Sequence, residues 1–205
     1  MARDEERLQR SREEPIVGGL PDTPGILTAL RLTPALGVHL RGLADELLVD
    51  DFPGAPISRP QREMLATAVS AANDCFYCMD SHGAFATALL EKTGDADRVA
   101  LIDTIKVGSS DGLDPKMQAL LRISRTVQRA PRELTATDVD AALAAGASDA
   151  DVQLAVLIAA AFSMYNRMVD GFRAQTPPTA EAYRARASEI ADFGYSAPAV
   201  TSVPR

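Results

Sequence analysis

Hydrophobic residues recur every three or four positions along most of the chain, which is the spacing of one face of an α-helix. No segment alternates hydrophobic and polar residues as a half-buried strand would. Alanine and leucine are abundant, whereas isoleucine and the aromatic residues are sparse, and this composition favours helices. The sequence therefore predicts an all-α fold.

Residues that start and stop helices divide this pattern. Ser58, Asp114 and Ser148 are typical first residues of helices, and Thr93-Gly94-Asp95 is a typical break. The expected helices span about 33–48, 58–72, 75–92, 96–107, 114–129, 135–145, 148–172 and 179–193. Asn73 or Asp74 is expected to cap the third of them.

The pattern also predicts how the chain is organised. Residues 1–22 are rich in Arg and Glu and predict a flexible, solvated N-terminal arm. Residues 23–175 form the expected all-α domain, and residues 176–205 a C-terminal helix and tail. Ser58–Ser81 and Ser148–Gly171 are both capped, Ala-rich helical runs, a similarity that would fit an internal duplication of a helical motif. Only the first run carries cysteines.

Size and charge restrict the function. With 205 residues, 46% of them hydrophobic, the chain can form one sizeable core. The net charge is −7 and the basic residues are scattered, which argues against nucleic acid or an anionic membrane as a partner. No uncharged apolar run reaches the roughly 18 residues of a membrane helix, and the charged first 15 residues are unlike a secretory signal. A cytoplasmic location is expected.

Two cysteines and a histidine stand out as candidate chemistry. Cys75 and Cys78, the only cysteines, are followed by His82 at a spacing that places all three on one helix face. Near the start of a helix the exposed backbone N–H groups favour a thiolate. Two thiols that close and reopen a disulfide beside a proton-transferring imidazole are suited to redox chemistry, and in a reducing compartment such a pair is more often catalytic or metal-binding than structural.

Glu63 is a fourth candidate. In one unbroken helix it would lie about 18 Å from Cys75, too far to take part. Asn73-Asp74 offers a break that lets two helices fold against each other. We therefore expect Glu63 to approach His82 and the cysteines.

These residues carry a family resemblance. Glu63, the pair Cys75 and Cys78, and His82 follow one another at a spacing that resembles the signature of the alkylhydroperoxidase D-like (AhpD-like) branch of the carboxymuconolactone decarboxylase family. The resemblance covers roughly residues 25–175, and the residues in and around the motif are similar to those of the peroxidase-related proteins of this branch. It implies an AhpD-like helical bundle that assembles as a homo-oligomer, a trimer or a hexamer.

The resemblance also implies a mechanism. Cys78 would attack a hydroperoxide and become a sulfenic acid, and Cys75 would resolve it as a disulfide. Glu63 and His82 would form the proton relay. The implied enzyme uses no haem, flavin or metal, and takes electrons from a separate thiol or lipoyl-protein reductant. Phe76-Tyr77 stands between the cysteines, where the best-known members have a further histidine.

A second function uses the same cluster. Cys75, Cys78 and His82 would supply three metal ligands and Glu63 a fourth, so a non-catalytic metal-binding or redox-sensing oligomer is the alternative. Structural zinc usually brings a second close pair of ligands, and the only other histidine, His39, is distant in the sequence.

Some polar residues outside the motif are further candidates. Tyr77 is a candidate substrate-binding residue, because its hydroxyl would form a hydrogen bond in the pocket, although a tyrosine in a helix more often packs its ring and exposes its hydroxyl to water. Asn166, Arg167 and Asp170 interrupt an apolar helix at a spacing that allows a buried polar network, an interface patch or a solvated helix end.

Overall fold

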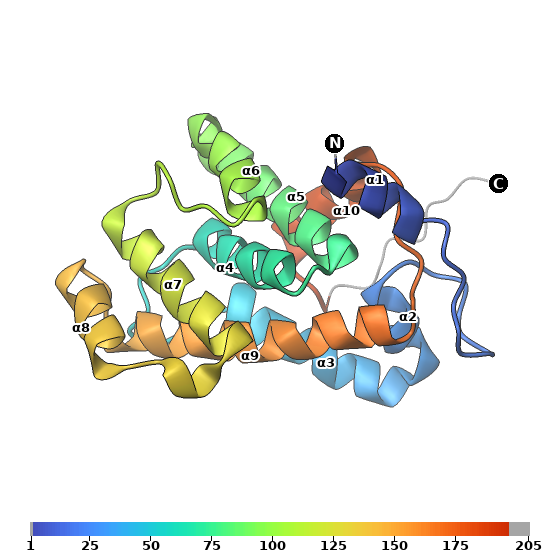
Figure 1. Ribbon diagram of the computed structural model, residues 1–205, viewed down its shortest axis with the longest axis horizontal. Coiled ribbons are helices and arrows are strands. Elements are labelled where there is room, and N and C mark those ends of the chain that lie inside the picture. Colours follow the sequence, from blue (N-terminus) through green and yellow to red (C-terminus); the bar gives the residue numbers. More distant parts are fainter. Residues whose placement is uncertain (1, 197–205) are drawn as a thin grey trace.

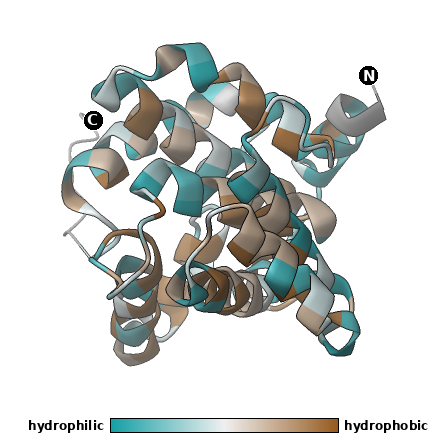
Figure 2. Cartoon of the chain, turned by 90° about the vertical axis from the view of Figure 1, so that its left-hand side faces the viewer, coloured by the Kyte–Doolittle hydropathy of each residue, from teal (hydrophilic) through white to brown (hydrophobic). Residues whose placement is uncertain are grey.

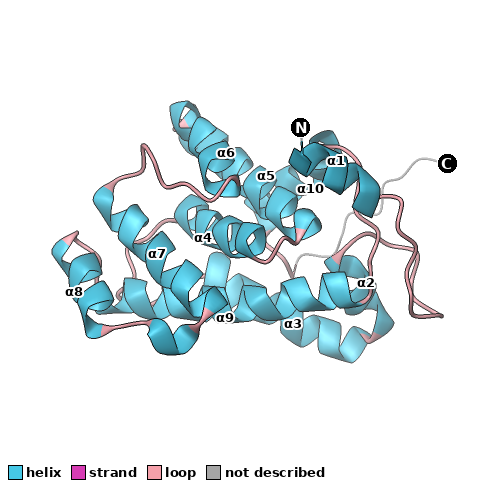
Figure 3. Cartoon of the chain, viewed as in Figure 1, coloured by secondary structure: helices cyan, strands magenta, loops and turns pink. Residues whose placement is uncertain are grey.

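The computed structural model of the protein describes residues 2–196, except for the side chains of residues 2–4 and 180. Within this range the chain is all-α, and none of the described residues forms a strand (Figure 3). The predicted fold class is confirmed. The helices are α1 (Ala2–Arg10), α2 (Ile26–Leu32), α3 (Pro34–Leu48), α4 (Arg59–Ala72), α5 (Phe76–Thr93), α6 (Ala100–Lys106), α7 (Pro115–Arg129), α8 (Ala136–Ala144), α9 (Asp149–Gly171) and α10 (Arg184–Phe193), with the short 3₁₀ helices η1 (Ala96–Arg98), η2 (Pro131–Glu133) and η3 (Ala180–Tyr183).

Most helices begin where local hydrogen bonding predicts. Ser58 forms a capping box with Gln61, and Thr135 and Ser148 form the same motif with acidic residues three positions on. The carboxylate of Asp114 accepts a hydrogen bond of 2.9 Å from the backbone N–H of Met117. These contacts satisfy backbone donors that the first helical turn leaves unpaired.

Helix α1 was not predicted. It lies within the segment expected to be a flexible arm, and Arg7 ties it to α5 by an ion pair of 2.8 Å to the buried Asp80. Arg10 adds a second contact, because its guanidinium lies 5.2 Å from the centre of the Phe76 ring. The division into arm, domain and tail stays a prediction, and residues 197–205 of the expected tail lie outside the described residues.

Helix α9 is the longest of the described helices. It runs across the molecule, with α4 and α7 on one side and α3 on the other (Figure 1). By length and composition α9 is the one described helix that could cross a membrane, but 56% of its apolar window is buried among the other helices, as in the core helix of a soluble protein. Hydrophobic and hydrophilic residues interleave along the helices, as amphipathic packing requires (Figure 2).

The helix pair that carries the candidate site is α4 and α5. The two helices fold back on each other and pack together along their length. Within this pair, Met64, Leu65 and Val69 of α4 are fully buried. The site therefore stands on the best-packed part of the fold.

Candidate active site

The turn between α4 and α5 brings the candidate residues together. The N–H of Cys75 donates to the carbonyl of Ser70 at 3.0 Å, and the N–H of Asp74 donates to Ala71 at 3.3 Å. Asp74 adopts the left-handed conformation, with φ 54°. This is a Schellman motif, which ends one helix and reverses the chain within a few residues. The break that the sequence indicated at Asn73-Asp74 is present.

The predicted cap of α5 is wrong. Asn73 closes α4 and Asp74 forms the turn, so that Cys75 itself is the residue that precedes α5. Cys78 is then the third residue of the helix. A side chain at the capping position lies over the third residue, which explains why the two sulfurs are close. Cys78 also lies in the first turn, where unpaired N–H groups favour an anion.

Both cysteines are free and buried, but their surroundings differ. Cys78 lines a largely apolar cavity, together with His82. Cys75 does not line this cavity, and it is fully buried in a cluster with Cys78, Val169 and Ala174. A molecule in the cavity therefore meets Cys78 first.

Glu63 and His82 form a buried pair. The Glu63 carboxylate is fully buried, and its Oε2 lies 2.7 Å from Nδ1 of His82. The ring of His82 is held between two aromatic rings, with centroid distances of 4.6 Å to Phe162 and 5.4 Å to Phe85. The structure thus places the carboxylate and the imidazole at hydrogen-bond distance, with the imidazole on the cavity wall beside Cys78.

Tyr195 completes this pair and was missed by the sequence analysis. Its hydroxyl donates to Oε1 of Glu63 at 2.7 Å and lies 3.3 Å from Nδ1 of His82. Asp45 of α3 fixes the segment by accepting the backbone N–H groups of Tyr195 at 2.6 Å and of Ser196 at 2.9 Å. Burial, followed by the negative charge of Glu63, raises the pKa of Tyr195 well above its usual range, so the phenol remains a donor.

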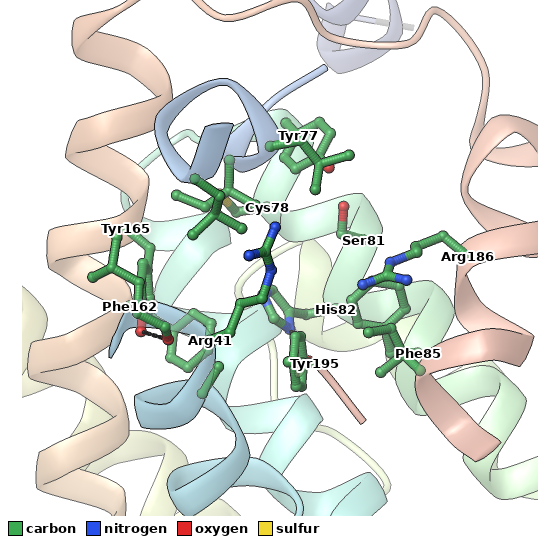
Figure 4. A pocket seen from close by; sticks show the side chains of 16 residues that line it. Arg41, Tyr77, Cys78, Ser81, His82, Phe85, Phe162, Tyr165, Arg186 and Tyr195 are labelled. Atoms are coloured by element: carbon green, nitrogen blue, oxygen red, sulfur yellow. Dashed lines mark hydrogen bonds between the residues drawn. The ribbon is translucent and has the colours of Figure 1, made fainter. Parts of the chain in front are cut away.

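The cavity beside Cys78 has a volume of about 70 Å³ (Figure 4). Its walls come from α2, α3, α5, α9, α10 and Tyr195, and most of them are apolar. The lining residues are Ile26, Leu27, Leu30, Leu40, Arg41, Ala44, Tyr77, Cys78, Ser81, His82, Phe85, Phe162, Tyr165, Arg186, Ile190 and Tyr195. The site is therefore a small, largely apolar cavity with a thiol and an imidazole in its wall.

Tyr77, the candidate substrate-binding residue, lies in this wall. Its ring contacts Tyr183 edge to face at 5.7 Å and lies directly against Gly25, where a Cβ atom would overlap the ring. Burial and the nearby Cys78 raise the pKa of Tyr77, so its hydroxyl stays protonated. Whether Tyr77 contacts a substrate stays a prediction.

Cys75 has an environment that opposes the thiolate. Its pKa is raised well above the ordinary value by the hydrogen bond to Cys78, then by burial and by the negative charges of Cys78 and Asp170. Burial also raises the pKa of Asp170, which Arg10 and a hydrogen bond with Cys75 oppose. The surroundings of Cys75 therefore favour its protonated thiol over its thiolate.

A buried polar network holds the turn against α9. Asn166 donates to Ser70 at 3.1 Å and accepts from Asn73 at 2.8 Å, and Gln128 of α7 donates to Asn73 at 2.8 Å. Of the three polar residues singled out in this helix, Asn166 belongs to a buried network, whereas Arg167 is exposed and bonds to its own helix. The network fixes the turn that carries Cys75.

The structure also bears on the metal-binding alternative. Among the described side chains, no three His, Cys, Asp or Glu residues are grouped so that they could hold a metal ion. Glu63 is bonded to His82 and Tyr195 instead. The carboxylate is thus engaged in hydrogen bonds rather than directed toward the sulfurs.

A segment of the chain matches the model of a known family. The model of the carboxymuconolactone decarboxylase family matches residues 40–125, a segment that includes Glu63, Cys75, Cys78 and His82. No curated protein matches. The resemblance expected from the motif is confirmed.

Solved structures share the fold. A crystal structure from Ralstonia eutropha JMP134, described as an alkylhydroperoxidase AhpD core and an uncharacterized peroxidase-related protein, is 25% identical, covers 81% of this chain and 82% of its own, and superposes with a TM-score of 0.66. An uncharacterized peroxidase-related protein from Silicibacter sp. TM1040 is 23% identical, covers 84% of this chain and 93% of its own, and gives a TM-score of 0.64. The chain thus has the helical fold of these proteins.

Proposed function

Since the chain resembles the carboxymuconolactone decarboxylase family through a segment that holds a cysteine pair, we propose that it is a thiol-dependent peroxidase, a disulfide oxidoreductase that reduces hydroperoxides. The family and the peroxidase-related structures suggest an enzyme of this kind. The observation that carries the proposal is the contact of 2.7 Å between Glu63 and His82, formed on the wall of the cavity that Cys78 also lines.

Proton transfer follows from this contact. A carboxylate on Nδ1 keeps the ring proton there and leaves Nε2 as the nitrogen that accepts a proton. His82 takes the Cys78 proton, and the Glu63 carboxylate stabilises the imidazolium that forms. The first turn of α5 favours the resulting Cys78 thiolate.

The reaction has two steps. The Cys78 thiolate attacks the outer peroxide oxygen, the O–O bond breaks, and the leaving alkoxide takes a proton from His82, which gives an alcohol and a Cys78 sulfenic acid. Cys75 then attacks the Cys78 sulfur, its proton leaves with the hydroxide as water, and a disulfide forms. The proton that Cys75 retains fits the role of the resolving thiol.

Electrons must return from outside the chain. Two thiols of a separate reductant, a dithiol or lipoyl protein, reduce the disulfide and complete the cycle. No haem, flavin or metal takes part in the proposal. The enzyme is proposed to act in the cytoplasm as a homo-oligomer, a trimer or hexamer, as the family resemblance implies.

The experiment treats the reduced protein with one equivalent of hydroperoxide and follows it by mass spectrometry, alongside metal analysis. A loss of two protons per chain, located to a Cys75–Cys78 disulfide, supports the peroxidase. One bound metal per chain, with thiols that resist peroxide, supports the alternative metal-binding or redox-sensing oligomer instead.

Variants assign the roles. Cys78→Ser abolishes peroxide consumption, whereas Cys75→Ser leaves a sulfenic acid that a dimedone-type probe traps on Cys78. Glu63→Gln slows the first step, and the matched control Glu133→Gln, in an exposed residue, does not. If Cys78→Ser retains activity and Cys75 is labelled, the roles of the two cysteines are reversed.

A further inference from the structure

The cavity beside Cys78 is lined by basic but not by acidic side chains, although the protein as a whole is negatively charged. Of its 16 lining residues two are arginines, Arg41 from α3 and Arg186 from α10, and none is acidic. The chain as a whole carries a net charge of −7. Figure 4 shows Arg41 reaching into the cavity between the aromatic wall and Cys78. A cationic side chain on the wall of a small cavity favours an anionic ligand, provided that no residue of the protein already neutralises it.

The two arginines differ in their partners. Arg186 forms an ion pair with Glu189 on the next turn of α10. Arg41 makes neither a hydrogen bond nor an ion pair with any residue of the described part of the chain. Arg41 is partly buried and lines the cavity together with mostly apolar residues, including Leu30 and Phe162. Arg41 therefore has five N–H donors free for a ligand, and a carboxylate matches their planar geometry.

The volume of the cavity limits the size of that ligand. The volume of about 70 Å³ is less than half of the roughly 150 Å³ of an engineered cavity that binds benzene. The cavity therefore encloses only a compact aliphatic group of the ligand, against Leu30, Phe162 and Ile190, while the rest of the ligand lies toward its open side. Any longer chain would have to extend through the mouth of the cavity.

We propose that the substrates reduced at Cys78 are short aliphatic hydroperoxides that bear a carboxylate, and that Arg41 binds this carboxylate. This inference rests on the proposed peroxidase function and adds the substrate class. The carboxylate takes no part in the redox steps: the hydroperoxy acid and two thiols give the hydroxy acid, one water and the disulfide. Arg41 orients the molecule so that its peroxide group faces Cys78.

Another role for Arg41 makes a different prediction. If the guanidinium instead stabilised the Cys78 thiolate, its loss would slow every reaction of that thiol, whatever the charge of the substrate. A substrate-binding arginine changes only the preference between charged and neutral molecules. The two roles are separated by comparing substrates of matched shape.

The binding experiment does not depend on turnover. The reduced protein is titrated by NMR with α-hydroxyisobutyrate and with tert-butanol, which differ only in a carboxylate that replaces a methyl group. The acid should bind at least about tenfold more tightly. Arg41→Gln should remove this preference, Arg41→Lys should keep part of it, and Arg31→Gln, in an exposed residue outside the cavity, should keep all of it.

The kinetic experiment compares the corresponding hydroperoxides. The ratio of kcat/KM for α-hydroperoxyisobutyrate over tert-butyl hydroperoxide should exceed about ten in the wild type and fall at least several-fold in Arg41→Gln. Equal binding of acid and alcohol by the wild type, or a preference that survives in Arg41→Gln, overturns the inference. So does slower alkylation of Cys78 by neutral iodoacetamide with an unchanged substrate ratio. If neither hydroperoxide is reduced, the proposed function fails, while the titration still shows whether Arg41 binds a carboxylate.

Discussion

Tyr195→Phe tests the hydrogen bond that completes the buried pair. The substitution removes one hydroxyl and leaves the ring in place, so Oε1 of Glu63 loses a donor at 2.7 Å. Glu63 is fully buried, and a lost hydrogen bond to a buried charge costs about 1.5–3 kcal/mol of the free energy of unfolding. For a chain of 205 residues this corresponds to a Tm lower by about 3–12 °C.

A double-mutant cycle isolates this contact. Tyr195→Phe, Glu63→Gln and the double variant are unfolded by heat and by urea, and the coupling free energy between the two positions should be about 1.5–3 kcal/mol. Tyr165→Phe is the matched control, because its hydroxyl donates at 2.7 Å to the neutral carbonyl of Leu40. It should cost about 0.5–1.5 kcal/mol and show no coupling to Glu63. A Tyr195→Phe protein as stable as the wild type, with zero coupling, would refute the proposed role of the hydroxyl.

Further predictions concern the surroundings of the site. Asp170→Asn removes a negative charge that raises the pKa of Cys75, so the thiolate fraction rises and alkylation of Cys75, followed by mass spectrometry, becomes roughly twofold to fivefold faster; an unchanged rate would mean that Asp170 does not act on this thiol. Gly25→Ala places a Cβ atom in the Tyr77 ring at a residue with φ 54°, so it should lower the free energy of unfolding in urea by at least about 2 kcal/mol, and a loss below about 0.5 kcal/mol would contradict the close contact. Asn166→Ala breaks the network that holds the turn, which should lower the free energy of unfolding in urea by about 1–3 kcal/mol. The backbone amides of the turn should then exchange their hydrogens at least about twofold faster, and exchange rates equal to those of the wild type would argue against that role.

The sequence predicted the parts of the site that lie close together in the chain. Glu63 and His82 belong to one helical hairpin, and the break between its helices was visible at Asn73-Asp74. Amphipathic periodicity and capping residues likewise predicted most helices, because these signals are local. The cap of α5 was wrong since a Schellman turn uses two residues before the next helix can begin, and a motif of backbone bonds leaves little trace in side-chain type.

The remaining wall of the site has no such local signal. Tyr195 lies 132 residues from Glu63 in sequence, and it reaches the pair only because Asp45 of α3 binds its backbone. Arg41 lies on an amphipathic helix with no unusual sequence feature. Only the packing of α3 against its neighbours places it in the wall of the cavity that Cys78 also lines. Helix α1 carries few hydrophobic residues, so its contact through Arg7 could not be read from periodicity. Such residues are identified only once the tertiary arrangement is known.

The tertiary arrangement gives the two neighbouring thiols different surroundings. Cys75 and Cys78 are three residues apart and both are buried, so sequence and burial alone leave them equivalent. The reversal of the chain makes Cys75 the residue that precedes α5, in a buried cluster with Val169 of α9. There its hydrogen bond to Cys78, its burial and the nearby Asp170 oppose a negative charge on its sulfur. The same reversal places Cys78 in the first turn, on the cavity wall with the imidazole and a free guanidinium. In the proposed peroxidase reaction, a hydroperoxide in that cavity would meet Cys78 before Cys75, and this order is the one that attack followed by resolution requires.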